Sequence, residues 1–416
     1  MGFIRGQLNN PCNNLLFALL FLYKFMHKIT FITTHNWDTK RQGGFHKFAE
    51  ASAAAGINTV FFSFPRPYYG LFMKREQLNK EIINTLKKGK HYDFQGHDIF
   101  NVTFPTFRLP DAAGRFLPAG IMNFLLTHSF TSFRHFCKKY LSGTDCFVFE
   151  SCEGVAFIDK LRKIFPQAKM IYRPSDPMVY ASIPERVKNL EKHILYSSDL
   201  NILVNNEGLE AYKKSIPDFD SKVKYSILSN GIDINSYKKS YPVPELLQKQ
   251  NTILYVGAWE VEWPLLFKAA EKNPDYNYII VCPNYPSQEI QDKVADITNL
   301  FYIPGIKPAE VPAWITNCSV VMVPYVTDFY KDRPLGITAK YYQAMAAGKP
   351  IVAYCDTPKL KDAGVTVTYT YDDFITAVQA AIKEGSINYS FDLKNREWEN
   401  ITQQFIELVE KTEQKR

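Results

Sequence analysis

The sequence predicts two α/β domains, each a doubly wound, Rossmann-like parallel sheet, which face each other across a cleft. The chain has 416 residues, more than one hydrophobic core usually holds, so two domains are expected. Apolar runs of strand length alternate with helical patterns, which is typical of parallel sheets buried on both faces. The polar stretch 235–251 carries two prolines and interrupts this order once, which predicts a linker.

The expected strands are continuous apolar runs, seven before the linker and five after it. They are 28–34, 58–64, 98–104, 145–151, 169–175, 200–206, 224–230, 252–258, 276–282, 299–305, 319–325 and 349–354. The pattern places one domain at 27–240 and another at 250–385. Residues 386–416 should form a helix with a charged face that crosses back over the junction. Ligands of open α/β sheets bind at the carboxyl ends of the strands, so the cleft is the expected site.

Residues 1–26 form an apolar N-terminal extension. The run 15–25 is largely apolar but well short of the ~20 residues that a membrane-spanning helix requires. No small-residue cleavage site follows it before the first expected strand. An anchor on the membrane surface is one interpretation. An unstructured extension, with Met26 as the true start, is the other.

Charge is divided unevenly along the chain. Residues 1–240 hold 32 Lys and Arg and 20 Asp and Glu, or +12; the rest hold 17 and 22, or −5, which together give +7. A basic first half favours an anionic partner, either nucleic acid or an anionic membrane surface, against the alternative of a solvated basic face. Segment 71–93 is basic and is predicted to be helical, and segment 116–140 is rich in aromatic residues. Together they resemble a surface that lies on anionic lipid. Crossover helices with a charged outer face are the alternative.

The cysteines and histidines give no sign of a metal site. Seven cysteines without a CxxC or close pairs favour a reducing compartment, and the eight histidines show no ligand spacing. The Asp-Phe-Asp triplet 218–220 follows a proline in a polar loop, so we expect it to face solvent. The sequence therefore predicts neither a metal nor another cofactor.

The segment GITAKYYQAMAAGKPIVAY (336–354) joins a helix to a buried strand. The helix is predicted to begin near Leu335, so that the N–H groups of residues 336–338 form an anion site. Lys340 then lies within reach of a phosphate, and Gln343, on the same face, can address a ribose hydroxyl. In the alternative interpretation the helix only packs on the sheet and Lys340 is solvated.

Four segments carry a resemblance to a known family. SNGID (229–233), ILYVGAWE (253–260), VVMVPY (320–325) and KYYQAMAAGKPIVAY (340–354) together resemble the two-domain GT-B glycosyltransferases, over roughly residues 28–385. The retaining branch of that fold carries two glutamates in an E-x7-E pattern, where this chain has Leu335 and Gln343. A closer resemblance is to the GumK-like glucuronosyltransferases of xanthan assembly, which are inverting enzymes of the inner membrane face.

The resemblance implies a uridine diphosphate donor held by the second domain. Lys340 would bind the diphosphate, while Tyr325, Gln343 and the Gly257 loop would supply contacts to uracil and ribose. The donor-binding residues that we expect are Gly257, Tyr325, Thr338, Ala339, Lys340 and Gln343. Gly257 also has its own rationale, because a residue without a Cβ lets a phosphate approach the backbone. Lys331 and Arg333 are candidates to pair with a donor carboxylate, and solvated loop charges are the alternative.

Asp176 is the expected catalytic base. Inverting transfer requires a group that takes the proton of the acceptor hydroxyl. Asp176 follows the strand that ends in Tyr-Arg, as the catalytic Asp of the similar family does. In the competing interpretation Ser175 or Asp176 caps a helix after Pro177. Glu150 and Glu153 are the second choice as base.

The loop 34–48 should open into the cleft and bind the acceptor. Its glycines 43 and 44 permit a close approach at a helix start. Trp37 could stack on a sugar, and Asp38 or Arg41 could bond to it. With Arg173 they complete the expected acceptor site. A connecting loop capped by its own polar residues is the alternative.

These expectations combine into an inverting glycosyltransferase of polysaccharide synthesis. It would move a sugar, with glucuronic acid implied by the resemblance, from a UDP-sugar to a saccharide acceptor. A polyprenyl-diphosphate-linked acceptor is among the options. The enzyme would work as a peripheral protein on the cytoplasmic face of the cell membrane, with no nucleic acid partner. The alternatives are a retaining GT-B enzyme with another nucleotide-sugar, a sugar-nucleotide epimerase, and a non-catalytic protein that binds nucleotide or membrane.

Overall fold

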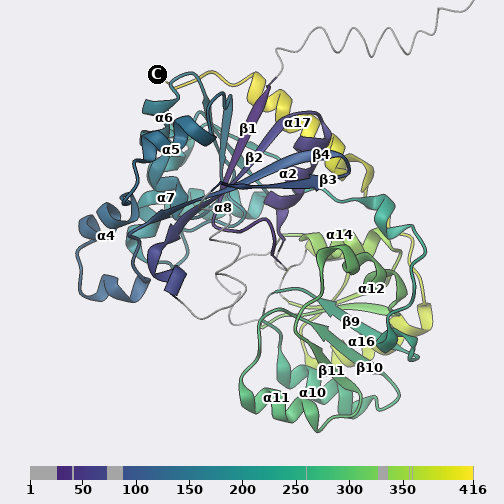
Figure 1. The fold of residues 1–416 in the computed structure, drawn as a ribbon. Coiled ribbons are helices and arrows are strands. Elements are labelled where there is room, and N and C mark those ends of the chain that lie inside the picture. The colour runs from purple at the N-terminus through teal and green to yellow at the C-terminus, as the bar shows by residue number, and fades with distance from the viewer. Residues whose placement is uncertain are drawn as a thin grey trace, which may run out of the picture.

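The computed structural model describes residues 26–39, 42–72, 88–258, 260–326, 336–355, 357 and 359–415. Two parallel-sheet domains are stacked in Figure 1, which confirms the predicted fold class. The expectations for residues 1–25, Arg41, Lys331 and Arg333 lie outside the described residues, as does most of the predicted basic helix 71–93.

The first sheet has eight strands in the order β3-β4-β2-β1-β5-β6-β7-β8, and all neighbours except β3 and β4 are parallel. Its strands are β1 Lys28–Thr33, β2 Asn58–Pro67, β3 Lys90–Phe94, β4 His97–Thr106, β5 Cys146–Phe149, β6 Lys169–Tyr172, β7 Leu200–Leu203 and β8 Tyr225–Ile227. The expected helix over residues 90–93 is wrong, because these residues form β3. Gln95 and Gly96 both have positive φ, at 52° and 85°, and close a two-residue hairpin turn that pairs β3 with β4.

The second sheet has six parallel strands in the order β11-β10-β9-β12-β13-β14. They are β9 Thr252–Val256, β10 Asn277–Val281, β11 Leu300–Ile303, β12 Val320–Pro324, β13 Ile351–Tyr354 and β14 Thr366–Thr368. The sequence did not predict β14, an edge strand of three residues with one exposed, one half-buried and one buried side chain. All twelve predicted runs contain a strand, and most of these strands have side chains buried on both faces of their sheet. The edge strands β8 and β11 are exceptions, since β8 has no buried side chain and β11 has only one.

Helices cover both faces of the two sheets (Figure 1). In the first domain they are α2 Gly44–Ala54, α4 Ala119–Leu126, α5 Phe133–Tyr140, α6 Ile158–Ile164, α7 Glu185–Ser197, α8 Asn206–Ser215 and α9 Phe219–Lys222. In the second they are α10 Trp263–Lys272, α11 Gln288–Ala295, α12 Val311–Asn317, α14 Ala339–Ala346, α15 Lys359–Asp362 and α16 Tyr371–Glu384.

The last helix, α17 (Trp398–Glu410), returns to the first domain, as predicted. Its Phe405 packs edge-to-face on Phe48 of α2, with ring centroids 4.7 Å apart. At the junction the N–H of Ile232 donates to the carbonyl of Arg396 at 2.7 Å, and the N–H of Trp398 donates to Ile232 at 3.2 Å. A Cβ on Gly231 would lie 2.6 Å from the Trp398 ring, so this crossing requires glycine. The two chain segments between the domains are therefore bonded to each other.

Candidate active site

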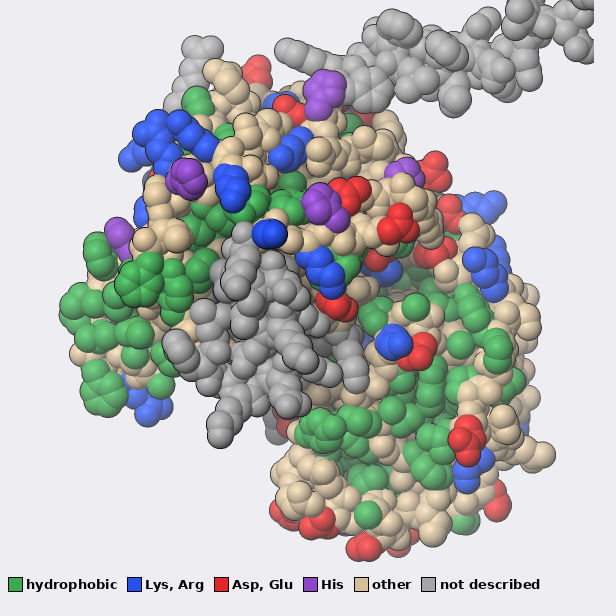
Figure 2. All heavy atoms as spheres, viewed as in Figure 1, with side chains coloured by type: hydrophobic (Ala, Val, Ile, Leu, Met, Phe, Trp, Pro, Cys, Tyr) green, Lys and Arg blue, Asp and Glu red, His purple; other side chains and the backbone are tan. Residues whose placement is uncertain are grey.

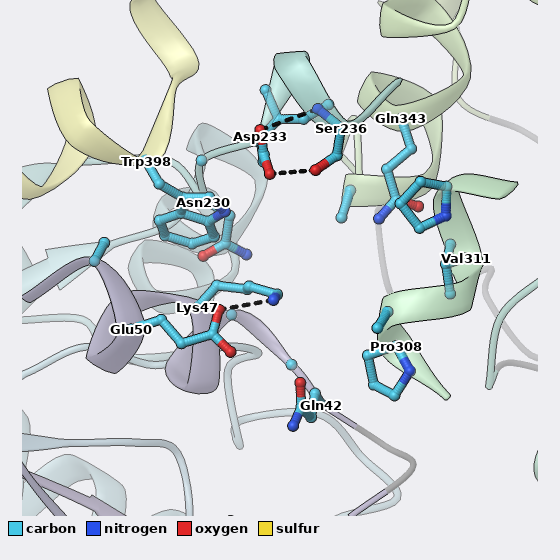
Figure 3. Close-up of a pocket in the computed structure, with 18 of the residues that line it drawn as sticks. Gln42, Lys47, Glu50, Asn230, Asp233, Ser236, Pro308, Val311, Gln343 and Trp398 are labelled. Carbon is cyan, nitrogen blue, oxygen red and sulfur yellow. Dashed lines mark hydrogen bonds and ion pairs between the residues drawn. The ribbon is translucent and has the colours of Figure 1, made fainter. Parts of the chain in front are cut away.

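A cavity of about 1110 Å³ lies between the two domains. The first domain contributes the exposed face of α2 and residues 230–233, and the second contributes residues that follow β9, β10 and β11. In Figure 3, Lys47, Glu50 and Asn230 face Pro308, Val311 and Gln343 across this space. Ligand pockets commonly enclose about 300–1,000 Å³, so the cavity can hold a nucleotide-sugar together with part of a second substrate.

Helix α14 begins later than the sequence predicts. It starts at Ala339 with Thr338 as N-cap, so its first N–H groups belong to residues 339–341 and not to 336–338. Gly336 lies outside the helix against α8 of the other domain, where a Cβ would be 2.8 Å from Asn205 Nδ2. Ala339 lines the cavity, and Thr338 Oγ1 is buried without a hydrogen-bond partner among the described residues. The N–H of Tyr341 already donates to the carbonyl of Thr338 at 3.1 Å, so the donors that the start of α14 offers to an anion are the N–H groups of Ala339 and Lys340 and the Thr338 hydroxyl.

Lys340 is partly buried between two tyrosines. Its Nζ lies 5.4 Å from the ring centroid of Tyr255 and 4.7 Å from that of Tyr325, and it donates to the Tyr325 hydroxyl. Burial lowers the pKa of Lys340 from 10.5 to about 7. The alternative in which Lys340 is merely solvated is therefore wrong.

Gly257 separates Lys340 from the cavity that it helps to line. A Cβ at this position would lie 2.6 Å from the Tyr255 hydroxyl and 3.2 Å from Lys340 Cε. The missing side chain lets the lysine and the tyrosine pack directly beneath the cavity wall. A phosphate at the start of α14 would then lie close to a lysine that has no carboxylate partner among the described residues.

The predicted donor residues occupy two layers. Gly257, Ala339 and Gln343 line the cavity, whereas Tyr325 is 1% exposed and supports Lys340 from behind. An apolar slot that the sequence did not predict lies at the carboxyl ends of β10 and β11, and it is formed by Val281, Pro283, Gly305, Ile306 and Pro308. Gly305 has φ +79° and turns the chain directly after β11. The sequence signal for this turn was a glycine at the end of a predicted strand run.

Asp176 lies in the exposed loop after β6, and residues that line the cavity do not include it. Its N–H donates to Ser151 Oγ at 3.3 Å. The capping alternative is wrong, because α7 begins at Glu185 with Pro184 as N-cap. A Cβ on Gly208 in the first turn of α8 would lie 3.5 Å from Cγ of Pro177, the residue after Asp176, and a Cβ on Gly336 would lie 2.8 Å from Asn205 Nδ2 at the start of the same helix. The Asp176 loop and the chain that precedes the donor helix therefore both lie near the start of α8.

The second-choice bases are both held in hydrogen bonds. Glu150 accepts from the hydroxyl of Thr33 and, at 2.8 Å, from that of Ser175. Glu153 accepts from Arg108 and Arg186. Both carboxylates are buried, so either would have to lose these bonds before taking a proton from an acceptor.

The predicted acceptor residues are only partly at the surface. Trp37 is 7% exposed and packs on Phe61 and His46 with centroids 5.1 and 5.5 Å away, so the expectation that it stacks on a sugar is contradicted by its burial. Asp38 is exposed, with Oδ2 3.7 Å from Lys90 Nζ.

Arg173 is fully buried, which rules out direct contact with an acceptor in this conformation. It lies over the Phe48 ring and donates from Nη2 to Asn230 Oδ1 at 2.8 Å. Burial lowers its pKa to about 10. Asn230 lines the cavity, so Arg173 positions a cavity residue from beneath.

The described residues contain no group of three or more His, Cys, Asp or Glu side chains arranged to hold a metal ion. Within the triplet 218–220, Asp218 pairs with Lys222 and Asp220 with Lys213. These two carboxylates are engaged in surface ion pairs.

Two family models match the chain. Residues 31–204 match the N-terminal domain of the glucuronosyltransferase GumK, and residues 250–384 match the glycosyl transferases group 1. No curated protein sequence that was compared matches significantly.

Several solved structures share the fold. Sucrose-phosphate synthase from Thermosynechococcus elongatus has a TM-score of 0.66 at 16% identity, over 92% of this chain and 98% of that one. Anabaena HepE in complex with UDP and glucose has a TM-score of 0.61 at 12% identity, over 92% and 99%. A UDP-forming α,α-trehalose-phosphate synthase from Burkholderia xenovorans, in complex with glucose-6-phosphate, has 0.64 at 12%, over 92% and 99%. At these identities the likeness shows the fold alone.

Proposed function

This chain is a glycosyltransferase of the GT-B fold that joins a GumK-type N-terminal domain to a group 1 C-terminal domain, and on that premise we propose that it transfers a sugar, with inversion, from a UDP-sugar to a saccharide acceptor. The observation that carries the proposal is the arrangement of Lys340 behind Gly257 at the start of α14, on the wall of the cavity between the domains.

The donor is proposed to lie along the second domain. Its diphosphate would meet the N–H groups at the start of α14 and the Lys340 ammonium, both of which favour negative charge. Gln343, which lines the cavity from the same helix, would bond to the ribose. The slot between Pro283 and Ile306 would receive the base, since apolar walls suit a planar ring.

The transfer step needs few groups. The acceptor hydroxyl attacks the anomeric carbon while the bond from that carbon to the diphosphate oxygen breaks, and UDP leaves. Asp176 would take the hydroxyl proton as the new bond forms. The start of α14 and Lys340 would stabilise the charge that develops on the leaving diphosphate. No metal ion or other cofactor is needed in this scheme.

Calorimetric binding of UDP, with ADP and GDP as controls, tests the donor assignment. We expect selective binding of UDP and a loss of about 1–3 kcal/mol in Lys340→Ala, because a charge-assisted hydrogen bond is removed. Equal binding of all three nucleotides, or unchanged affinity in the variant, would refute it.

The base and the stereochemistry have separate tests. Asp176→Asn should remain folded and bind UDP but lose at least about a hundredfold in turnover, as general bases typically contribute. A product that keeps the anomeric configuration of the donor would exclude inversion.

Glucuronic acid is the donor sugar that we propose. The support is the match of residues 31–204 to the GumK N-terminal domain. Initial rates with UDP-glucuronic acid and UDP-glucose, at equal concentrations and with one acceptor, give the ratio of the two kcat/KM values. A higher value for UDP-glucose would overturn this assignment.

We also propose that the first domain rests on the cytoplasmic surface of the cell membrane. Hydrophobic side chains gather over α4 in Figure 2, and those of Phe116, Phe124 and Phe130 are 86%, 57% and 83% exposed. Helix α5 of the same domain carries Lys138 and Lys139 in its last turn. Exposed aromatic rings and lysines on one domain are typical of proteins that bind anionic lipid surfaces. No helix in the described part of the chain is long and apolar enough to cross a bilayer.

Sedimentation with vesicles tests this attachment. The parent protein should sediment with vesicles that contain phosphatidylglycerol, and Phe116→Ser with Phe124→Ser should reduce the bound fraction several-fold. Tyr285→Ser is the matched control, since Tyr285 is 68% exposed on the other domain. An equal bound fraction for all three proteins would contradict membrane attachment through Phe116 and Phe124.

A further inference from the structure

Two arginines of the first domain converge on one carboxylate oxygen. Nη2 of Arg108 and Nη2 of Arg186 lie 3.5 and 3.6 Å from Asp111 Oδ1. Hydrogen bonds from nitrogen to oxygen are typically 2.7–3.2 Å long, so Asp111 fills this position loosely. Its side chain is 57% exposed. The place between the guanidinium groups can therefore accept a different anionic oxygen without disturbing the core.

The inner sides of both guanidinium groups are fixed. Arg108 Nε and Arg186 Nη2 donate to the two oxygens of Glu153, which is buried. Arg108 Nη1 donates to the hydroxyl of Tyr69 at 3.2 Å, and Arg186 Nη1 donates to Asn123 Oδ1 at 3.1 Å. Two guanidinium groups held in this way are preorganised for a phosphate. Arginine binds phosphate well because the N–H donors of its guanidinium group lie in one plane.

The charges of the cluster also favour an anion from outside. Arg108 and Arg186 are balanced by Glu153 and Asp111, and of the two acids only Asp111 is exposed. If its carboxylate turns away, the remaining three groups carry one net positive charge. A phosphate can then replace the carboxylate at the point where the two Nη2 atoms meet.

The position of the cluster shows what the rest of the ligand must be. Arg108 follows β4 and Glu153 follows β5, so both lie at the sheet edge from which the Asp176 loop also leaves after β6. On the other side, Asp111 opens the 3-10 turn η2 (Asp111–Arg115), which leads directly to Phe116 and α4. An anionic site thus lies between the cleft and an exposed apolar surface.

Both arginines are recessed, with side chains 23% and 11% exposed for Arg108 and Arg186. A phosphate that replaces the exposed Asp111 carboxylate would reach them at their Nη2 atoms. This depth suits one specifically bound molecule better than the headgroups of a bilayer, which would meet only the outermost side chains.

We propose that Arg108 and Arg186 bind the phosphate or diphosphate of a lipid-linked acceptor, with its hydrocarbon chain on Phe116, Ile121 and Phe124 and its saccharide directed to the cleft. The inference rests on the proposed function and names the class of acceptor. It also assigns Asp111 a role as the group that occupies the site until the acceptor binds.

Farnesyl diphosphate is a suitable probe because it carries the diphosphate and an apolar chain without a sugar. Calorimetry should show that it binds the full chain, and that farnesol and inorganic pyrophosphate each bind at least about tenfold more weakly. Asp111→Asn should tighten binding several-fold, because a competing carboxylate is removed. Arg186→Gln should weaken it at least about tenfold, and Arg186→Lys should recover part of the loss.

UDP binding and thermal unfolding of each variant separate the possible failures. Asp111 is exposed, so Asp111→Asn keeps the test valid if Arg186→Gln unfolds. If UDP binds but farnesyl diphosphate affinity does not change in any variant, the inference is overturned and the proposed function stands. If pyrophosphate binds as well as farnesyl diphosphate, the lipid part is overturned. If the parent fails to bind UDP, the donor assignment fails, and the response of farnesyl diphosphate to the variants still decides the acceptor site.

Discussion

Affinity for UDP should fall steeply with rising pH above neutrality, because of Lys340. In the unliganded protein burial lowers the pKa of this lysine to about 7, and the groups that face it are Tyr255, Tyr325, Cys282 and Cys355. A diphosphate favours the charged form and must raise this pKa again toward its ordinary value of 10.5. Binding above pH 7 therefore takes up a proton.

The magnitude follows from the fraction of charged lysine. With a pKa of about 7, roughly half of the unliganded molecules carry the charge at pH 7 and about one in a hundred at pH 9. The apparent affinity should then fall about tenfold, or 1.4 kcal/mol, for each pH unit above 7. The slope ends where the pH passes the pKa of the liganded protein.

Titration calorimetry at pH 8.5 in HEPPS and in Tris measures the proton uptake directly, since the two buffers differ in ionisation enthalpy and neither is a phosphate that would compete for the site. We expect close to one proton for each UDP bound by the parent and none in Lys340→Met. The exposed Lys361 supplies the control, and Lys361→Met should behave like the parent. A parent affinity that is constant from pH 7 to 9, or an unchanged slope in Lys340→Met, would refute the reasoning.

Three further predictions follow from the same structure. Gly257→Ala should fold but bind UDP at least about tenfold more weakly, because its Cβ would displace Tyr255 and Lys340; calorimetry checks this, and parent-like affinity would show that the lysine is not held there. Lys340→Met should raise the melting temperature of the unliganded protein most below pH 7, and progressively less as the pH rises to 10.5. The reason is that the folded parent must bury a charged lysine at low pH. A rise in melting temperature that is the same at pH 6 and pH 9.5 would contradict this. Trp37→Ala should destabilise the first domain by about 3–5 kcal/mol in chemical denaturation, as loss of a buried ring does; near-parent stability with a large rise in acceptor KM would restore its role in sugar binding.

Much of the donor side could be predicted from the sequence because the relevant residues are close along the chain. Ala339, Lys340 and Gln343 lie in the first two turns of α14, and the apolar run before Gly257 marks the end of a strand. Local patterns of this kind are set by backbone geometry. The start of α14 was misplaced by a few residues, because contacts of Gly336 with Asn205 and Glu207 of the other domain occupy the preceding chain.

The acceptor side could not be predicted in the same way. Trp37 and Arg173 both follow a strand at the cleft edge, a position that suggests a binding role, yet the tertiary structure buries them under Phe61 and Asn230. Glu153 accepts hydrogen bonds from Arg108 and Arg186, which are 45 and 33 positions away from it in the chain. No periodicity in the sequence records such a contact.

The sequence by itself therefore determined twelve parallel strands of the two sheets, the returning C-terminal helix and the donor helix, because strands and helix faces that pack in a core leave a local hydrophobic pattern. Only the tertiary structure decided which polar side chains line the cavity and which support it from beneath. It also decided the state of Lys340, whose pKa is lowered by burial at a place beside tyrosines that are 85 and 15 positions away in the chain. Burial and charge balance depend on distances in space, and these are defined only once the two domains and the returning helix have packed together.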